Sequence, residues 1–257
     1  MKSGHKLWTR DELMLAINLY CKLPFGKLHS KTKEVKDLAF LIGRTANSVA
    51  LKLVNFSSLD PTLQARGISG MGNASKLDEE VWKEFYNNWG EALIYSEKLL
   101  AKEKKTTIEK QNDVDLSDLP SEGKEKERLV RTRVNQSVFR KIILATYNNT
   151  CCITRINNAD LLIASHIIPW SKDEKNRLNP MNGLCLNALH DRAFDKGLIT
   201  IDAESYTIRV SHKLKLKNTI NSISQNFISF EGETILLPDK FIPSRDYLKV
   251  HNDFFGY

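Results

Sequence analysis

A charged stretch without hydrophobic periodicity, residues 101–127, most constrains how this chain can fold. It mixes acidic and basic side chains, contains one Pro and one Gly, and has only five apolar residues. Such a segment cannot bury enough surface to offset the entropy that is lost when it becomes ordered. We therefore expect a linker here, between an N-terminal module at 1–100 and a C-terminal module at 128–257.

The overall composition is that of a folded protein. Hydrophobic residues make up 41% of the 257 positions and charged residues 27%, close to the average of soluble globular domains. No apolar run approaches the roughly 20 residues that cross a bilayer, and no apolar stretch of signal-peptide length follows the basic N-terminus. The four cysteines include no CxxC spacing, so we expect buried, reduced thiols. These features predict a cytoplasmic protein with no membrane partner.

The N-terminal module has the apolar spacing of a helical bundle. Thr9 is a candidate N-cap for a first helix, and Thr45 is one for a helix over 46–55. Ser75 with Asp78 predicts the start of a further helix.

Most of the net positive charge lies in the first quarter of the chain. The formal net charge is +7, and residues 1–56 hold ten basic and four acidic side chains, a bias typical of surfaces that bind polyanions. The segment from WTRDELMLAI to GRTANSVALKLVNF resembles the Myb/SANT-like helix-turn-helix class, whose third helix lies in the DNA major groove. The resemblance implies DNA contacts by Arg44, Asn47, Ser48 and Lys52. A solvated helix face is the alternative.

The segment 151–202 carries the strongest chemical pattern. Residues 161–165, LLIAS, are a short β-rich run that delivers His166 at its end. Asn182 lies in an Asn-Gly turn, a second short apolar strand follows, and then a helix with His190. The predicted order is strand, loop, strand and helix.

This arrangement resembles the HNH endonuclease family, whose fold is a ββα-metal unit. The matching residues are His166, Asn182 and His190, within the strings SHIIPW and NPMNGLCLNALHDRAFD. The resemblance implies an α+β protein with an N-terminal helix-turn-helix-like bundle and a C-terminal ββα-metal nuclease domain extended by a small sheet. It also implies metal-dependent hydrolysis of double-stranded DNA, as in restriction-type bacterial enzymes.

The family likeness assigns a role to each matching residue. His166 would be the general base, because neutral imidazole suits that task at cellular pH. Asn182 would hold the loop and orient the base. His190 would bind one divalent ion, Mg²⁺, Mn²⁺, Co²⁺ or Ni²⁺.

The second metal ligand departs from the family pattern. Many family members have an Asp or a His immediately before the general base, whereas this chain has Ser165. Asp195 is therefore the expected ligand, and a cap for the turn at Gly197 is its alternative role.

Residues 206–217 alternate like a strand and place four basic side chains on one face. These side chains are Arg209, Lys213, Lys215 and Lys217. They would contact DNA phosphates or protect an exposed sheet edge, and the sequence leaves both options open.

Two other functions and the oligomeric state also stay open at this point. The chain would be a non-enzymatic DNA-binding regulator if the HNH fold had decayed, which the intact His166, Asn182 and His190 argue against. It would be a structure-specific or homing-type nickase if the biological task differed. A homodimer would explain double-strand cleavage, since each ββα unit cuts one strand.

Overall fold

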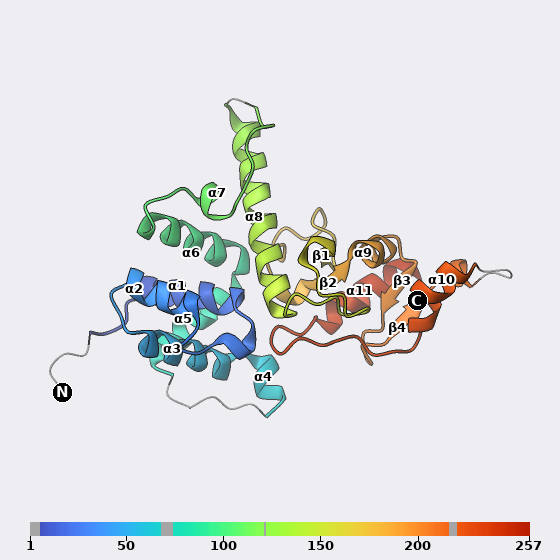
Figure 1. Ribbon diagram of the computed structural model, residues 1–257, viewed down its shortest axis with the longest axis horizontal. Coiled ribbons are helices and arrows are strands. Elements are labelled where there is room, and N and C mark those ends of the chain that lie inside the picture. Colours follow the sequence, from blue (N-terminus) through green and yellow to red (C-terminus); the bar gives the residue numbers. More distant parts are fainter. Residues whose placement is uncertain (1–5, 68–73, 121, 216–219) are drawn as a thin grey trace. The chain divides into compact units, whose positions relative to one another are not determined.

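The computed structural model describes residues 6–67, 74–120, 122–215 and 220–257. It consists of two compact units, Met1–Ile142 and Ile143–Tyr257. Helices form unit 1, while unit 2 combines helices with small antiparallel sheets (Figure 1). The predicted α+β class is therefore confirmed.

Unit 1 is built around its first helix. Its helices are α1 (Arg10–Lys22), α2 (Lys33–Leu41), α3 (Ala46–Leu59), α4 (Pro61–Ala65), α5 (Lys76–Asn87), α6 (Trp89–Glu103), α7 (Ile108–Gln111) and the start of α8 (Lys124–Thr146). Helix α1 contacts α2, α3, α5 and α6. Its Tyr20 ring meets Phe56 and Trp82 edge to face, with ring centroids 6.4 and 5.8 Å apart. This aromatic cluster is fixed by long-range packing, which offsets the low stability of short isolated helices.

Local capping begins the helices where the sequence predicts. The Thr9 hydroxyl accepts a hydrogen bond from the Glu12 backbone N–H, and the Glu12 carboxylate accepts one from Thr9. Ser75 and Asp78 form the same reciprocal pair at α5. The predicted caps are confirmed because they depend only on neighbours in sequence.

The segment 101–127 contains helical structure that its composition does not reveal. It includes the end of α6, all of α7 and the first turn of α8. The Asn112 amide donates to the Glu97 carboxylate at 3.0 Å, and Arg133 pairs with Asp118 at 2.6 Å. Polar contacts hold this segment, so hydrophobic periodicity could not predict it. The three-part division of the chain stays a prediction.

Unit 2 contains two small sheets and the helices that cover them. Its elements are β1 (Leu162–His166), β2 (Gly183–Asn187), α9 (Ala188–Asp195), β3 (Ile199–Ile201), β4 (Ile208–Val210), α10 (Asn221–Asn226) and α11 (Arg245–Phe255). Strand β1 pairs antiparallel with β2, and β3 pairs antiparallel with β4. Helix α9 contacts β1, β2 and β3, while α11 contacts β3. Strand β2 is buried along its whole length.

The C-terminal end of α9 is held by α11. Gly197 has φ +61°, and a Cβ there would lie 2.1 Å from Cδ1 of Phe255, so only glycine fits. The Phe194 ring stacks on the His251 ring with centroids 3.8 Å apart. The Tyr257 hydroxyl donates to the Gly197 carbonyl at 2.9 Å.

The expected strand over 206–217 is shorter than the alternation predicts. It ends at Val210, and the Ser211 side chain then caps a 3₁₀ turn, His212–Leu214, by accepting from the Lys213 backbone N–H. A hydroxyl that offers the backbone a local partner ends the extended run. Arg209, Lys213 and Lys215 therefore do not share one strand face, and Lys217 lies outside the described residues.

The membrane and cysteine expectations concern the described part of the chain only. Within it, none of the helices has the length and apolar character that crossing a membrane requires. All four cysteines are unbridged and buried, as expected.

Candidate functional site

His166 stands at the end of β1, opposite Gly183 of β2. Its Nε2 lies 2.9 Å from the backbone oxygen of Arg177, and its ring meets the Trp170 ring edge to face at 5.4 Å. The pKa of His166 is lowered, mainly by burial. The Arg177 carbonyl and the charge of Asp195 raise it, and the Arg177 guanidinium lowers it. The ring is therefore neutral at neutral pH.

Asn182 ties together the two ends of the loop that follows His166. Its side-chain oxygen accepts from the Ile168 backbone N–H at 2.8 Å. Its amide donates to the backbone oxygens of Ile168 and Asn176, each at 3.3 Å. Asn182 is only 1% exposed. The side chain has no bond to His166 itself among these contacts, so its effect on the ring passes through the loop.

His190 is buried on α9 and faces a different part of unit 2. Its Nε2 lies 2.8 Å from the Asn226 backbone oxygen, and its Nδ1 lies 3.1 Å from the side-chain oxygen of Asn187. The rings of Phe227 and Phe230 lie 5.3 and 5.7 Å from it. A neutral ring has one N–H, so it donates to one of these two oxygens, and the two contacts hold α9 in place. The metal-ligand role of His190 stays a prediction.

Asp191, the next residue, is the group that sequence reasoning missed. It is half-buried, and its pKa is raised, mainly by burial. The hydrogen bond from Ser165 lowers the pKa, and the charge of Asp195 raises it. Asp191 and Asp195 are one helical turn apart, so they share one face of α9. The i, i+4 spacing of these aspartates was visible in the sequence, but which face of α9 meets β1 was not.

The predicted ligand Asp195 is exposed at the end of α9. The following turn is closed by backbone bonds, from Gly197 N–H to Phe194 O and from Leu198 N–H to Ala193 O, both at 2.9 Å. The described contacts of the Asp195 carboxylate include no cap to this turn. The ligand role of Asp195 stays a prediction.

The donor set near β1 fits a hard divalent ion. Asp191 and Asp195 offer carboxylate oxygens, and the buried Ser165 Oγ has no hydrogen bond of standard geometry among the described residues. Mg²⁺ binds through one or two carboxylates and completes its shell with water and phosphate oxygens. Within the described ranges, no group of three or more His, Cys, Asp or Glu side chains is arranged for an ion. Asp191 and Asp195 are thus the carboxylates that the described part of α9 offers.

The predicted DNA contacts of unit 1 include two side chains that serve its interior. Arg44 pairs with Glu12 at 2.7 Å, with side-chain exposures of 6% and 11%, and its guanidinium lies 4.1 Å from the Trp8 ring centroid. Lys52 pairs with the buried Asp78 at 2.7 Å. The other two predicted contacts, on α3, are Asn47, which is exposed, and Ser48, which is partly exposed.

The basic residues in β4 and after it are more open. Arg209 pairs with Asp202 at 3.5 Å and Lys215 with Glu231 at 2.7 Å, while about half of each basic side chain stays exposed. Lys213 is exposed and takes part in none of the described ion pairs.

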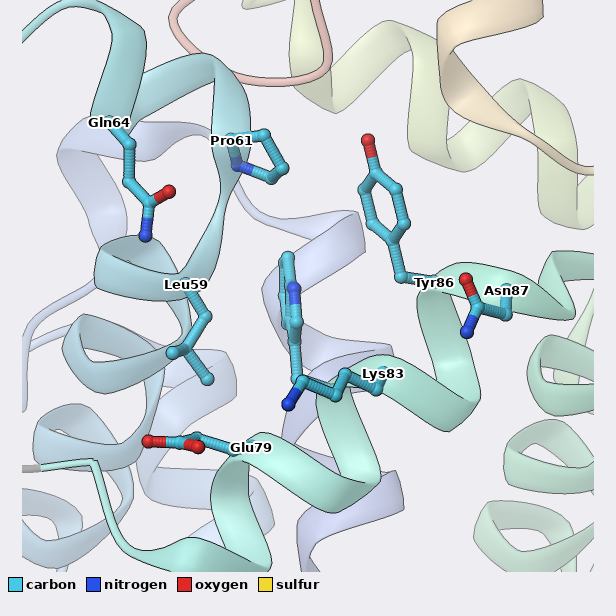
Figure 2. Close-up of a pocket in the computed structure, with 8 residues that line it drawn as sticks. Leu59, Pro61, Gln64, Glu79, Lys83, Tyr86 and Asn87 are labelled. Carbon is cyan, nitrogen blue, oxygen red and sulfur yellow. The ribbon is translucent and has the colours of Figure 1, made fainter.

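A separate pocket of about 300 Å³ lies in unit 1 between the end of α3, α4 and α5. Figure 2 shows Leu59, Pro61 and Gln64 on one side of it and Tyr86 and Asn87 on the other. Its lining contains no histidine, cysteine or pair of carboxylates.

A neutral imidazole at the end of β1 that senses the charge of Asp195, with Asp191 of the same helix contacting the neighbouring Ser165, is a combination suited to hydrolysis. Residues 151–202, about a fifth of the chain, match a family model described as HNH endonuclease. This segment is accordingly assigned to the HNH endonuclease family, which implies a nuclease-type function in general terms. Among curated proteins, none matches the chain.

Proposed function

We propose that this protein is a metal-dependent endonuclease that hydrolyses phosphodiester bonds in double-stranded DNA, in a restriction or defence role. The observation that carries the proposal is the environment of His166: its Nε2 faces a backbone carbonyl, and Asp195 is close enough to shift its pKa. The match to the HNH endonuclease family supports the same reaction.

His166 acts as the general base. A carbonyl oxygen only accepts, so the Nε2 proton of His166 is donated to Arg177 and the lone pair of the neutral ring is on Nδ1. This nitrogen takes the proton of the attacking water. Asn182 holds both ends of the 168–176 loop and so keeps the acceptor carbonyl near the ring.

Asp191 and Asp195 would hold the divalent ion, Mg²⁺, Mn²⁺, Co²⁺ or Ni²⁺. Bound there, the ion would stabilise the charge that develops on the phosphate and the departing oxygen. The buried His190 supports this site by fixing α9 to Asn187 and Asn226. In this arrangement Asp191 replaces His190 as the ligand expected from the family likeness.

The test is cleavage of supercoiled plasmid DNA by the full chain with Mg²⁺, Mn²⁺ or EDTA. We expect cleavage with metal and none with EDTA. Asp191→Asn should raise the metal concentration needed for half-maximal cleavage, because one ligand loses its charge. His190→Gln should mainly lower stability. No cleavage under any metal would contradict the proposal and favour a DNA-binding regulator with a decayed fold.

The products separate the remaining roles. Double-strand breaks in unmodified plasmid fit the restriction role, which requires two cuts and therefore two copies of the chain acting together. Nicks restricted to branched DNA fit a structure-specific or homing-type nickase. Sequencing the cleaved ends identifies the site and checks the 5′-phosphate and 3′-hydroxyl that the family likeness implies.

A further inference from the structure

Arg177 touches the neighbourhood of His166 with both its backbone and its side chain. Its carbonyl oxygen lies 2.9 Å from Nε2 of His166. Its side chain donates from Nε to the Trp170 carbonyl at 2.7 Å. The two contacts belong to one residue, so whatever fixes the side chain also limits where the carbonyl can move.

The side chain closes the loop from 170 to 177 in three ways. Besides the bond to the Trp170 carbonyl, the guanidinium lies 5.2 Å from the centroid of the Trp170 ring. It also pairs with Glu174 at 3.0 Å, although that carboxylate is largely exposed. The Arg177 side chain itself is 25% exposed, so part of this closure is shielded from water. The Trp170 ring in turn meets the His166 ring edge to face.

We propose that Arg177 is a positioning residue: by closing the loop onto Trp170 it fixes its own carbonyl against His166 and so decides which ring nitrogen carries the proton. That this choice matters for cleavage rests on the proposed nuclease function. The effect on the ring itself does not depend on that function.

The physical argument depends on the direction and reach of one hydrogen bond. A carbonyl has no proton to give, so Nε2 must donate. Hydrogen bonds weaken steeply once the heavy atoms separate beyond about 3.5 Å, so a loosened loop would release Nε2–H. The neutral ring would then exchange between its two tautomers, and Nδ1 would hold the lone pair only part of the time.

Asn182 cannot supply this restraint alone. Its amide reaches the backbone of Ile168 and Asn176 but not that of Arg177. Lysine is also a poor substitute for arginine here, because it lacks the planar group that stacks on Trp170 while donating sideways from Nε. The restraint on the loop therefore needs the planar guanidinium group of Arg177, and its charge alone is not sufficient.

The test uses the ¹⁵N chemical shifts of the His166 ring in the full chain, without metal or DNA, at neutral pH. The His166 signals are identified by their loss in His166→Gln. We expect one protonated and one unprotonated nitrogen in the parent protein, with Nε2 protonated. In Arg177→Ala both nitrogens should move to intermediate values, and Arg177→Lys should shift in the same direction. The lysine variant retains the charge, so it decides the question if the alanine variant does not fold.

Arg245→Ala is the matched control. Arg245 also lies over an aromatic ring, 4.7 Å from the Tyr206 centroid, and also donates to a backbone oxygen, that of Ala203 at 2.9 Å. It contacts the segment after β3 and should leave His166 unchanged. Unaltered His166 shifts in folded Arg177→Ala or Arg177→Lys, or a tautomer mixture in the parent protein, would overturn the proposal.

Cleavage supplies the second readout. Arg177→Ala should lower kcat by up to about a hundredfold, the scale for a misplaced catalytic group, with KM nearly unchanged; a fall in binding alone would contradict it. Failure of the nuclease proposal is a separate outcome. If the parent protein cuts no DNA but Arg177→Ala still changes the His166 tautomer, the proposed function is refuted and the role of Arg177 is supported.

Discussion

Unit 1 and the site of unit 2 both bury polar side chains, but they satisfy them differently. In unit 1 opposite charges meet each other, as in Arg44 with Glu12 and Lys52 with Asp78. In the site of unit 2, His166 and Asn182 bond to backbone groups instead. Paired charges hold helices together, whereas burial keeps His166 neutral and the backbone carbonyl of Arg177 sets the position of its proton.

The same comparison qualifies the charge argument for DNA binding by unit 1. The excess of basic residues in 1–56 includes Arg44 and Lys52, whose charges are already neutralised inside the fold. A count of charges along a sequence therefore overstates the charge that a DNA backbone would meet.

The largest expected effect is that of His166→Ala. Losing a general base should lower the rate of hydrolysis by about two to four orders of magnitude. DNA affinity should change little, because the ring takes a proton and does not hold a phosphate. Single-turnover cleavage and a binding titration at fixed salt measure the two quantities. Near-normal cleavage would show that His166 is not the general base, and the carbonyl contact of His166 would then have a structural role like that of the ion pairs in unit 1.

Arg44→Met should produce the next largest effect, on stability. Removing one partner of a buried ion pair leaves the other uncompensated and costs about 3–5 kcal/mol; here Lys6 still contacts Glu12, so we expect the lower end. Urea denaturation measures it. The control is Lys33→Ala, since Lys33 and Asp37 form an exposed pair with side-chain exposures of 84% and 57%, for which about 0.5 kcal/mol or less is expected. Unchanged stability with weaker DNA binding would instead support the predicted DNA contact.

The two units should lose stability in different pH ranges. Burial lowers the pKa of His251 to about 4 from 6.5, so the unfolded chain binds the extra proton first and unit 2 weakens as pH falls from 6.5 to 4. Burial raises the pKa of Glu97, but the charge of Lys22 and the amide donors outweigh burial and lower this pKa from 4.5 to about 2. Unit 1 should therefore lose stability as the pH falls from 4.5 to 2. Each effect is at most about 3 kcal/mol.

Amide hydrogen exchange at a series of pH values resolves the two units separately. Glu97→Gln should remove the pH dependence of stability in the lower range only, and His251→Phe should remove it in the upper range only. One shared transition that both substitutions shift would show that the units do not respond independently.

The smallest effect is expected for Lys213→Ala. If Lys213 contacts one DNA phosphate, its loss should lower the slope of log K against log salt by about 0.9. Lys249→Ala, which removes an exposed lysine on α11, is the control and should leave the slope unchanged. Equal slopes for Lys213→Ala and the parent protein would favour the alternative role in protecting a sheet edge.

The features that the sequence predicts well are local ones. Capping by Thr9 and Ser75 follows from neighbouring residues. The two short strands lie where the apolar runs predict them, but Asn182 ends a 3₁₀ turn and Gly183 is the extended first residue of β2, so Asn-Gly forms no tight turn between the strands. The contacts of α8 with residues 112–113 and the partner of Arg44 lie across tens of residues. Charged and polar side chains make those contacts, and they leave no hydrophobic period to detect.

The site shows the same limit on a smaller scale. The order of His166, Asn182 and His190 was visible in the sequence, but the roles assigned to them rested on family position. Whether His190 or Asp191 faces β1 depends on the rotation of α9, and one residue along a helix is a turn of about 100°. Only the packed structure supplies that angle.

The family match stops at residue 202, yet the shape of its last helix depends on chain well beyond it. His190 bonds to Asn226, thirty-six positions later, and Phe194 stacks on His251. The folding unit is thus larger than the motif. A graft of 151–202 into another scaffold, or an exchange of this segment between relatives, would transfer the reactive groups without the contacts that orient them.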